Sequence, residues 1–262
     1  MPIFRYVHYL YLRGYAGGRL TVNAQGGGYG NALQAASSRG HKEIARMLLE
    51  KGADVNAQGG EYGNALQAAS SRGHKVIARM LLERGADVNA QGGIYGNALQ
   101  AASSEGHKEI ARMLPERGAD VNAQGGIYGN ALYAASSRGH KEIAQMLLEK
   151  GADLNAQGGV YGNALYAASS EGHTEIARML LEKGADVNAQ GGEYGNALQA
   201  ASSRGHKEIA QMLLDVAEGA DVNAQGGVYG NALYAASSEG HTEIARMLLE
   251  KGACHGAAQQ LP

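Results

Sequence analysis

The sequence predicts an all-α fold, a helical solenoid in which short repeats stack one on the next. The 27 residues at 159–185 return unchanged at 227–253, tyrosines recur every 33 residues, and each period contains two helix-forming segments. A period of 20–50 residues is typical of stacked repeats that contact only their neighbours. One such repeat cannot bury its own apolar face, so several in a row are needed to form a core.

Seven repeats fill residues 22–253. Their marker is a tyrosine that recurs at intervals of 33 residues, with a last interval of 35: Tyr29, Tyr62, Tyr95, Tyr128, Tyr161, Tyr194 and Tyr229. Residues 1–21 are interpreted as the remnant of a preceding repeat or cap, and residues 254–262 as a C-terminal tail. The repeats would therefore form one continuous array.

Local signals divide each repeat into two helices and an extended finger. In the first repeat, Asn31 precedes an Ala-rich segment and is a good N-cap, since its side chain can accept a bond from a free helix N–H. Gly40 is expected to end this first helix. A second helix is expected over about 42–51, with Gly52 after it. The Gly-rich remainder predicts a β-turn or hairpin finger.

Composition excludes several classes of function. The net charge of -2 argues against nucleic-acid binding, which needs clustered Lys and Arg. No run approaches the roughly 20 apolar residues of a membrane span. Arg5, His8 and Arg13 interrupt the apolar N-terminus, which argues against a signal peptide. The single Cys254 fits a reducing compartment, so we expect a soluble protein of the cytoplasm.

Motifs that could carry chemistry are repeated in every unit, which favours a structural role. The stretch GGGYGN at 26–31 lacks the Lys-Ser/Thr of a phosphate loop. Ser37, Ser38 and His41 recur seven times without a third group to orient the base. Equivalent histidines of packed helices lie roughly 8–10 Å apart, whereas Zn–N bonds are about 2 Å. We therefore expect no catalytic site, no metal and no cofactor.

The stretch GHKEIARMLLEKGADVNA resembles an ankyrin repeat, and the 33-residue period agrees. The resemblance covers nearly nine-tenths of the chain and recurs seven times. It departs from the family's TPLH motif, which here reads NALQ or NALY, so that Gln34 or Tyr133 replaces a His that braces neighbouring fingers. Near-identical repeats of this kind resemble the arrays of fungal ankyrin proteins, often the C-terminal part of NOD-like receptors. The resemblance implies helix-turn-helix repeats that bind proteins.

In ankyrin repeats the finger tips and the exposed ends of the first helices line a concave groove, and three columns of the repeats vary there. The finger-tip column includes Glu61, Ile94, Ile127, Val160, Glu193 and Val228. A first-helix column alternates between Gln and Tyr, with the tyrosines at Tyr133, Tyr166 and Tyr234. The column at the end of the first helix includes Arg72, Glu105, Arg138, Glu171 and Arg204.

These columns predict a protein-binding scaffold without catalytic activity. Ile94, Ile127 and Val160 would place apolar side chains at consecutive tips, with the tyrosines as aromatic anchors, and would centre binding on repeats three to five. The alternative is a self-assembling scaffold that stacks end to end through uncapped terminal repeats. The tyrosine of each finger is expected to pack on the next finger.

Two irregularities interrupt the repeats. Pro115 stands where most repeats have Leu, and we expect a local distortion at 112–117, because a proline inside a helix removes one hydrogen bond. The stretch LLDVAEGADVN at 213–223 is two residues longer than its counterparts. We expect the extra residues to lengthen the second helix or to bulge at its end, while repeat seven keeps its stacking.

Overall fold

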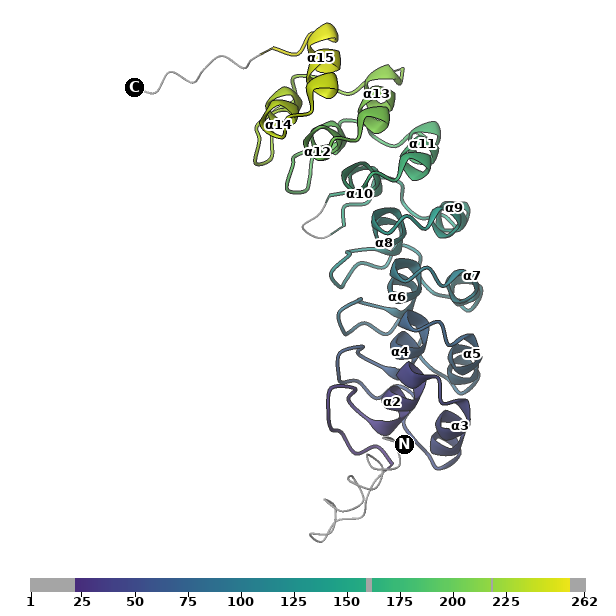
Figure 1. The fold of residues 1–262 in the computed structure, drawn as a ribbon. Helices are drawn as coiled ribbons and strands as arrows, with labels where there is room; N and C mark the ends of the chain where they lie inside the picture. The colour runs from purple at the N-terminus through teal and green to yellow at the C-terminus, as the bar shows by residue number, and fades with distance from the viewer. Residues whose placement is uncertain (1–21, 159–161, 218, 255–262) are drawn as a thin grey trace. The chain divides into compact units, whose positions relative to one another are not determined.

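The computed structural model describes residues 22–158, 162–217 and 219–254 (Figure 1). Within these residues the regular elements are fourteen α-helices, two in each of the seven repeats, and no strand. The all-α fold class is confirmed. None of these helices is long and apolar enough to cross a membrane.

Each repeat contributes a first and a second helix. The first helices are α2 (Ala32–Arg39), α4 (Ala65–Ser71), α6 (Ala98–Ser104), α8 (Ala131–Ser137), α10 (Ala164–Glu171), α12 (Ala197–Arg204) and α14 (Ala232–Ser238). The second helices are α3 (Lys42–Glu50), α5 (Lys75–Glu83), α7 (Lys108–Glu116), α9 (Lys141–Glu149), α11 (Thr174–Glu182), α13 (Lys207–Asp215) and α15 (Thr242–Glu250).

The chain divides into two compact bodies, which are described separately. Of the described residues, the N-terminal body contains those in 22–102 and 109–119, and the C-terminal body those in 103–108 and 120–254. Inside each body, first helices pack on first helices and second helices on second helices, as α2 does on α4 and α11 on α13.

Both predicted caps of the first helix are confirmed. The Asn31 side chain accepts a hydrogen bond from Gln34 N at 2.9 Å, and the same bond recurs at the start of α4, α8, α10, α12 and α14. Gly40 follows α2 with a φ of 75°, the left-handed conformation that favours glycine. The second helix of this repeat ends at Glu50, one residue before the predicted bound.

The core is thin and consists of small side chains. Ala36 and Ala45 are buried, and each second helix adds a buried Ile or Leu such as Ile77 and Leu81. Alanine allows two helix backbones to approach closely. The serine column formed by the first serine of each SS pair is also buried in repeats one to six, at Ser37, Ser70, Ser103, Ser136, Ser169 and Ser202.

The fingers are closed by short backbone bonds, as predicted for a hairpin turn. Gly59 N donates to Gly63 O at 2.7 Å, and the same pair of positions forms an isolated antiparallel bridge in four fingers. Gly60 has a φ of 65°, and a Cβ atom there would lie 2.3 Å from the carbonyl carbon of Tyr29. Only glycine fits this position, because neighbouring finger backbones are in contact.

Pro115 lies inside α7, which keeps the nine-residue length of the other second helices. Arg117 N donates to Leu114 O at 3.0 Å, whereas its counterpart Lys51 N donates to the carbonyls of both Met47 and Leu48. The expected distortion at 112–117 therefore does not shorten the helix, and the bond of Arg117 differs from that of its counterpart.

The two extra residues of repeat six form a bulge, one of the two predicted outcomes. Helix α13 ends at Asp215, and Val216 is extended with φ -64° and ψ 157°. Ala220 N then donates to Leu213 O at 2.8 Å, the bond that Ala53 makes to Leu48 in repeat one. Helices α14 and α15 pack on α12 and α13, so the prediction that repeat seven keeps its stacking is confirmed.

Candidate functional site

The asparagine of each finger base is fully used in holding repeats together. Asn56 Oδ1 accepts from Asp87 N at 2.7 Å, and Asn56 Nδ2 donates to Gly85 O at 3.1 Å. The contact to the Asp N–H recurs in both bodies, for example between Asn188 and Asp221 at 2.7 Å. This ladder belongs to the scaffold and offers no site of chemistry.

The histidines form a second ladder between repeats. His74 Nε2 lies 3.2 Å from Ser38 O, and His241 Nε2 lies 3.0 Å from Ser203 O. The same contact joins His140, His173 and His206 to the preceding repeat. Each ring therefore bridges two repeats, in agreement with the structural interpretation of the Ser-Ser-x-Gly-His motif.

The glutamines of the first-helix column brace the next finger, in place of the histidine of the TPLH motif. Gln34 is fully buried, and its Nε2 donates to Ala57 O at 2.9 Å and to Gly63 O at 3.1 Å. Gln199 makes corresponding bonds to the finger of repeat seven. This column is part of the repeat interface.

The tyrosines of the same column require a correction. Tyr133 and Tyr166 are only 6% and 5% exposed, so they cannot be the exposed aromatic anchors that the sequence suggested. The physical reason is that the next finger covers the first helix: a Cβ on Gly158 would lie 2.9 Å from the Tyr133 ring, and one on Gly192 would lie 2.3 Å from the Tyr166 ring. Tyr234 in repeat seven is 57% exposed.

Burial of Tyr166 is accompanied by a polar contact of its hydroxyl. Tyr194 N donates to Tyr166 Oη at 3.2 Å, across the boundary between repeats five and six. Burial of the ring raises the pKa of Tyr166. The side chain thus replaces the glutamine brace with one bond and a larger apolar contact.

The finger tyrosines stack on one another, as predicted. The rings of Tyr29 and Tyr62 lie 6.5 Å apart and 9° from parallel, and those of Tyr194 and Tyr229 lie 6.0 Å apart. Arg72 contributes a further contact from the end of α4, with its guanidinium carbon 5.7 Å from the centre of the Tyr62 ring.

The hydroxyl of the finger tyrosine can form a hydrogen bond with either an arginine or a glutamate at the end of the first helix. Arg138 donates from Nε and Nη2 to Tyr128 Oη at 3.0 and 2.7 Å. In repeat seven the roles reverse: Tyr229 Oη donates to Glu239 Oε1 at 2.6 Å, and this bond raises the pKa of Tyr229. Arg and Glu can therefore alternate in this column without leaving the tyrosine unpaired.

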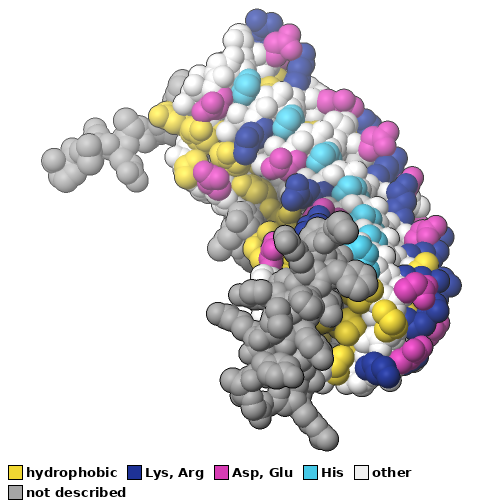
Figure 2. Space-filling view, turned by 60° about the horizontal axis from the view of Figure 1, so that its bottom comes forward, with side chains coloured by type: hydrophobic (Ala, Val, Ile, Leu, Met, Phe, Trp, Pro, Cys, Tyr) yellow, Lys and Arg dark blue, Asp and Glu magenta, His cyan; other side chains and the backbone are white. Residues whose placement is uncertain are grey.

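The charges at the ends of the first helices are exposed in all five predicted positions: Arg72, Glu105, Arg138, Glu171 and Arg204. In the C-terminal body they alternate in sign from one repeat to the next. Figure 2 shows this alternation as magenta and blue side chains beside the cyan histidines. A partner that contacts this series would meet acidic and basic groups in turn.

At the finger tips the backbone is hydrogen-bonded to the neighbouring finger, whereas the side chain is exposed to solvent. Ile94 N donates to Glu61 O at 3.1 Å, so adjacent tips are linked through the main chain. The side chains of Ile94, Ile127 and Val228 are nevertheless 39%, 51% and 65% exposed. Glu61 and Glu193 are exposed at the same column. Val160 lies outside the described residues.

The outer face, formed by the second helices, was not predicted to contain a site. Ion pairs join successive helices there, among them Lys141–Glu175 and Arg178–Glu208, both at 2.9 Å. The hydrogen bond from Lys141 lowers the pKa of Glu175. These pairs are exposed and act mainly as contacts between repeats.

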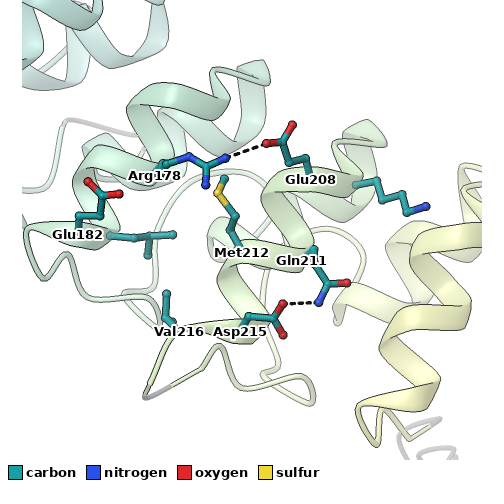
Figure 3. A pocket seen from close by; sticks show the side chains of 9 residues that line it. Arg178, Glu182, Glu208, Gln211, Met212, Asp215 and Val216 are labelled. Carbon is teal, nitrogen blue, oxygen red and sulfur yellow. Dashed lines mark hydrogen bonds and ion pairs between the residues drawn. The ribbon is translucent and has the colours of Figure 1, made fainter.

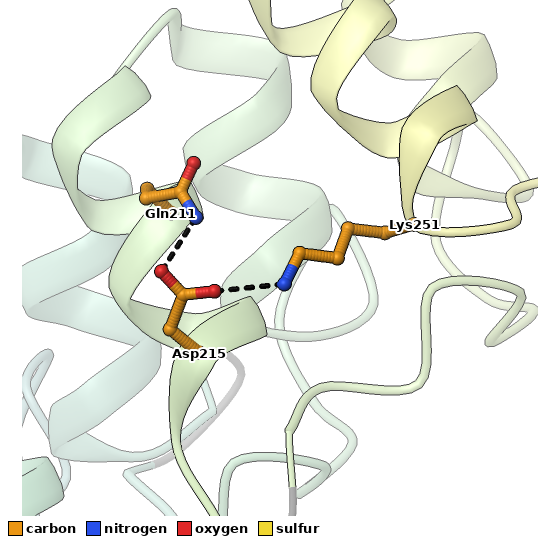
Figure 4. A network of polar contacts seen from close by, with 3 residues as sticks. All are labelled: Gln211, Asp215 and Lys251. Atoms are coloured by element: carbon orange, nitrogen blue, oxygen red, sulfur yellow. Dashed lines mark hydrogen bonds and ion pairs between the residues drawn. The ribbon is translucent and has the colours of Figure 1, made fainter.

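An open groove of about 660 Å³ lies on the outer face between α11 and α13 (Figure 3). Its lining includes Leu181, Met212 and Val216. Asp215 and Gln211 also line it, and Asp215 accepts hydrogen bonds from Gln211 and Lys251, at 2.5 and 2.8 Å (Figure 4). The two-residue insertion next to this groove is visible in the sequence, where it predicted a longer helix or a bulge and no binding surface.

These features define a class of protein: stacked helix-turn-helix repeats whose glycine-rich fingers contact one another. The chain matches the family described as "Ankyrin repeats (3 copies)" over residues 7–92, 34–125, 94–158, 124–191 and 190–259. The chain therefore belongs to the ankyrin repeat family. Ankyrin repeats are in general protein–protein interaction modules.

The chain is similar to two further proteins, of which the first is an ankyrin repeat domain by its description. The crystal structure of the human ASB11 ankyrin repeat domain is 25% identical and has a TM-score of 0.73, covering 86% of this chain and 100% of that domain. A 34-residue segment is 71% identical to "Azaphilone pigments biosynthesis cluster protein L" of Monascus ruber. That match covers 13% of this chain and 7% of the Monascus protein. It does not test the resemblance to NOD-like receptor arrays, which stays a prediction.

Proposed function

We propose that the chain is a non-catalytic scaffold that binds a protein through its finger tips and the ends of its first helices. One observation carries this proposal. The constant side chains of each repeat are engaged in contacts between repeats, whereas the tip and helix-end columns are exposed and vary. Variation at exposed positions changes what a partner meets and leaves the scaffold contacts intact.

The apolar tips support the proposal because they have no evident role in folding. Glu61 and Glu193 occupy the same column as Ile94 and Ile127, so the finger does not need an apolar tip. Exposed apolar side chains next to charged groups are typical of interaction sites. With Tyr133 and Tyr166 buried, the proposed anchors are the tip side chains.

The experiment compares a triple variant of the finger tips with a double control variant that also replaces exposed apolar side chains by glutamate. A partner is first isolated from a lysate of the source cells, identified and purified, and its affinity is then measured by calorimetry. We expect the variant Ile94→Glu, Ile127→Glu, Val160→Glu to lose at least tenfold in affinity and to fold normally. The control is Met47→Glu with Val76→Glu, which removes two equally exposed apolar side chains, both 56% exposed, from second helices.

The control variant should bind as the original chain does. If the tip variant binds within threefold of the original affinity, the assignment of the surface is wrong.

We propose that this binding takes place in the cytoplasm. The single thiol of Cys254, which is exposed and forms no disulfide, fits a reducing compartment. A fluorescent fusion found outside the cytoplasm would contradict that location.

End-to-end association of copies is the second candidate, and the exposed ring of Tyr234 favours it. Its counterparts Tyr133 and Tyr166 are each covered by a glycine of the next finger. A finger of a second copy could cover Tyr234 in the same way. Light scattering tests this candidate: the mass should rise with concentration and fall again in Tyr234→Glu. A mass equal to the monomer at all concentrations would exclude it.

A further inference from the structure

The groove between α11 and α13 is larger than its counterpart one repeat earlier. It encloses about 660 Å³, compared with about 340 Å³ for the groove between α9 and α11. Figure 3 shows Met212 and Val216 directed into it, with Arg178 bonded to Glu208 along one side. The bulge that follows α13 begins at Val216, one of the residues that line the larger groove.

The insertion also removes a positive charge from this groove. The residue directly after the second helix is basic in the six other repeats: Lys51, Arg84, Arg117, Lys150, Lys183 and Lys251. In repeat six that residue is Val216. Lys183 lines the smaller groove, whereas the half-buried Val216 lines the larger one. The larger groove thus has an apolar side chain where its counterpart has a cation.

A carboxylate at the rim of the groove has no cationic partner. Glu182, the last residue of α11, is exposed and forms no ion pair or hydrogen bond with any residue that the structure describes. Two cations line the groove, but both are paired with other carboxylates: Arg178 with Glu208 at 2.9 Å and Lys207 with Glu243 at 2.7 Å. The negative charge of Glu182 is therefore available at the edge of an apolar surface.

In the next repeat a lysine is bonded to the equivalent carboxylate. Asp215 stands at the position of Glu182, and Lys251 donates to it at 2.8 Å from the end of α15 (Figure 4). In repeat six the position after the second helix, which Lys251 occupies in repeat seven, is occupied by Val216. The chain supplies a lysine to Asp215 and none to Glu182, although the two carboxylates occupy the same place in their repeats.

We propose that this groove on the outer face binds a lysine or arginine side chain of a protein partner. The aliphatic part of the guest side chain would lie on Leu181, Met212 and Val216, and its charged end would meet the carboxylate of Glu182. Long basic side chains combine an apolar stem with a charged head, which matches a groove with an apolar floor and an acidic rim. This surface is formed by second helices and is separate from the fingers and first helices.

The test uses a minimal guest. Nα-acetyl-lysine amide is titrated into the full chain while the ¹³C-methyl signal of Met212 is followed by NMR. The comparison guest is Nα,Nε-diacetyl-lysine amide, which has the same stem without the charge. We expect a saturable shift with the cationic guest and at least fivefold weaker binding of the neutral one.

Variants then identify the groups that bind the guest. Glu182→Gln and Val216→Lys should each weaken binding of the cationic guest at least fivefold. Glu149→Gln changes the equivalent carboxylate of repeat four and should have no effect on it. The proposal is overturned if the Met212 signal does not saturate, if Glu182→Gln binds as the original chain does, or if both guests bind equally. The last result would identify an apolar site.

Discussion

The buried serine column permits a quantitative test of the core. In repeats one to six the first hydroxyl of the SS pair is buried, and no hydrogen-bond partner reaches it. Ser202 in α12 is fully buried, whereas Ser237 occupies the same position in α14 and is exposed. The two positions share the flanking sequence Ala-Ala-Ser-Ser and the same place in a first helix, so they form a matched pair for substitution.

The perturbation is Ser202→Ala, and two effects add. A buried hydroxyl without a partner costs about 1 kcal/mol or more relative to its hydrated state in the unfolded chain. Alanine also favours the helix over serine by about 0.5 kcal/mol. The variant should therefore be more stable by about 1.5 kcal/mol. At Ser237 only the helix term applies, so Ser237→Ala should gain about 0.5 kcal/mol.

The assay is urea unfolding followed by far-ultraviolet circular dichroism, with thermal melts as a second measurement. For a domain of this length about 1.5 kcal/mol corresponds to a rise in Tm of roughly 3–6 °C. Ser136→Ala repeats the test in another repeat and should match Ser202→Ala. Equal gains at Ser202 and Ser237, or a loss of stability at Ser202, would show that the buried hydroxyl has a hydrogen bond and would refute the reasoning.

Three further predictions concern the second helices and the helix ends. Pro115→Leu restores a helix hydrogen bond and should raise the free energy of unfolding by at least about 1 kcal/mol; an unchanged melt would contradict this. Arg138→Glu should change the free energy of unfolding by less than about 0.5 kcal/mol, because the Tyr128 hydroxyl can donate to a carboxylate. A larger loss in urea unfolding would show that the guanidinium is required. Lys141 lowers the pKa of Glu175 below 4.5, so the ion pair stabilises the fold above that pH. The difference in urea midpoint between the original chain and Lys141→Met should therefore shrink below pH 4.5. A difference that stays constant with pH would argue against the ion pair.

The fold could be predicted because its signals are local and repeated. Asn31 and Gly40 mark the ends of the first helix, and the 33-residue period shows that the same element follows seven times. The exposure of a side chain depends on the next repeat, which no local signal describes. For this reason Tyr133 and Tyr166 looked like surface residues, although the following finger covers them.

Of the candidate site, only the features that follow from local sequence could be predicted. Tip residues such as Ile94 extend beyond the contacts between fingers, so their exposure follows from their position at the turn. The paired state of Arg138 depends on Tyr128, ten residues away on the finger, and is visible only in three dimensions. The groove beside Val216 depends on where the chain goes after α13 ends, and an insertion in a sequence does not indicate whether it will continue a helix or leave it.

The asparagine ladder has a consequence for how such a chain can change in length. Within each body the junctions are closed by the same exchange, in which one repeat offers an amide oxygen and the next offers a backbone N–H, as Asn56 and Asp87 do. Loss or gain of one whole repeat leaves every donor matched to an acceptor, because the newly adjoining repeats present the same groups. Recombination between near-identical gene segments can therefore lengthen, shorten or reorder the tips and helix-end charges while the joints stay the same.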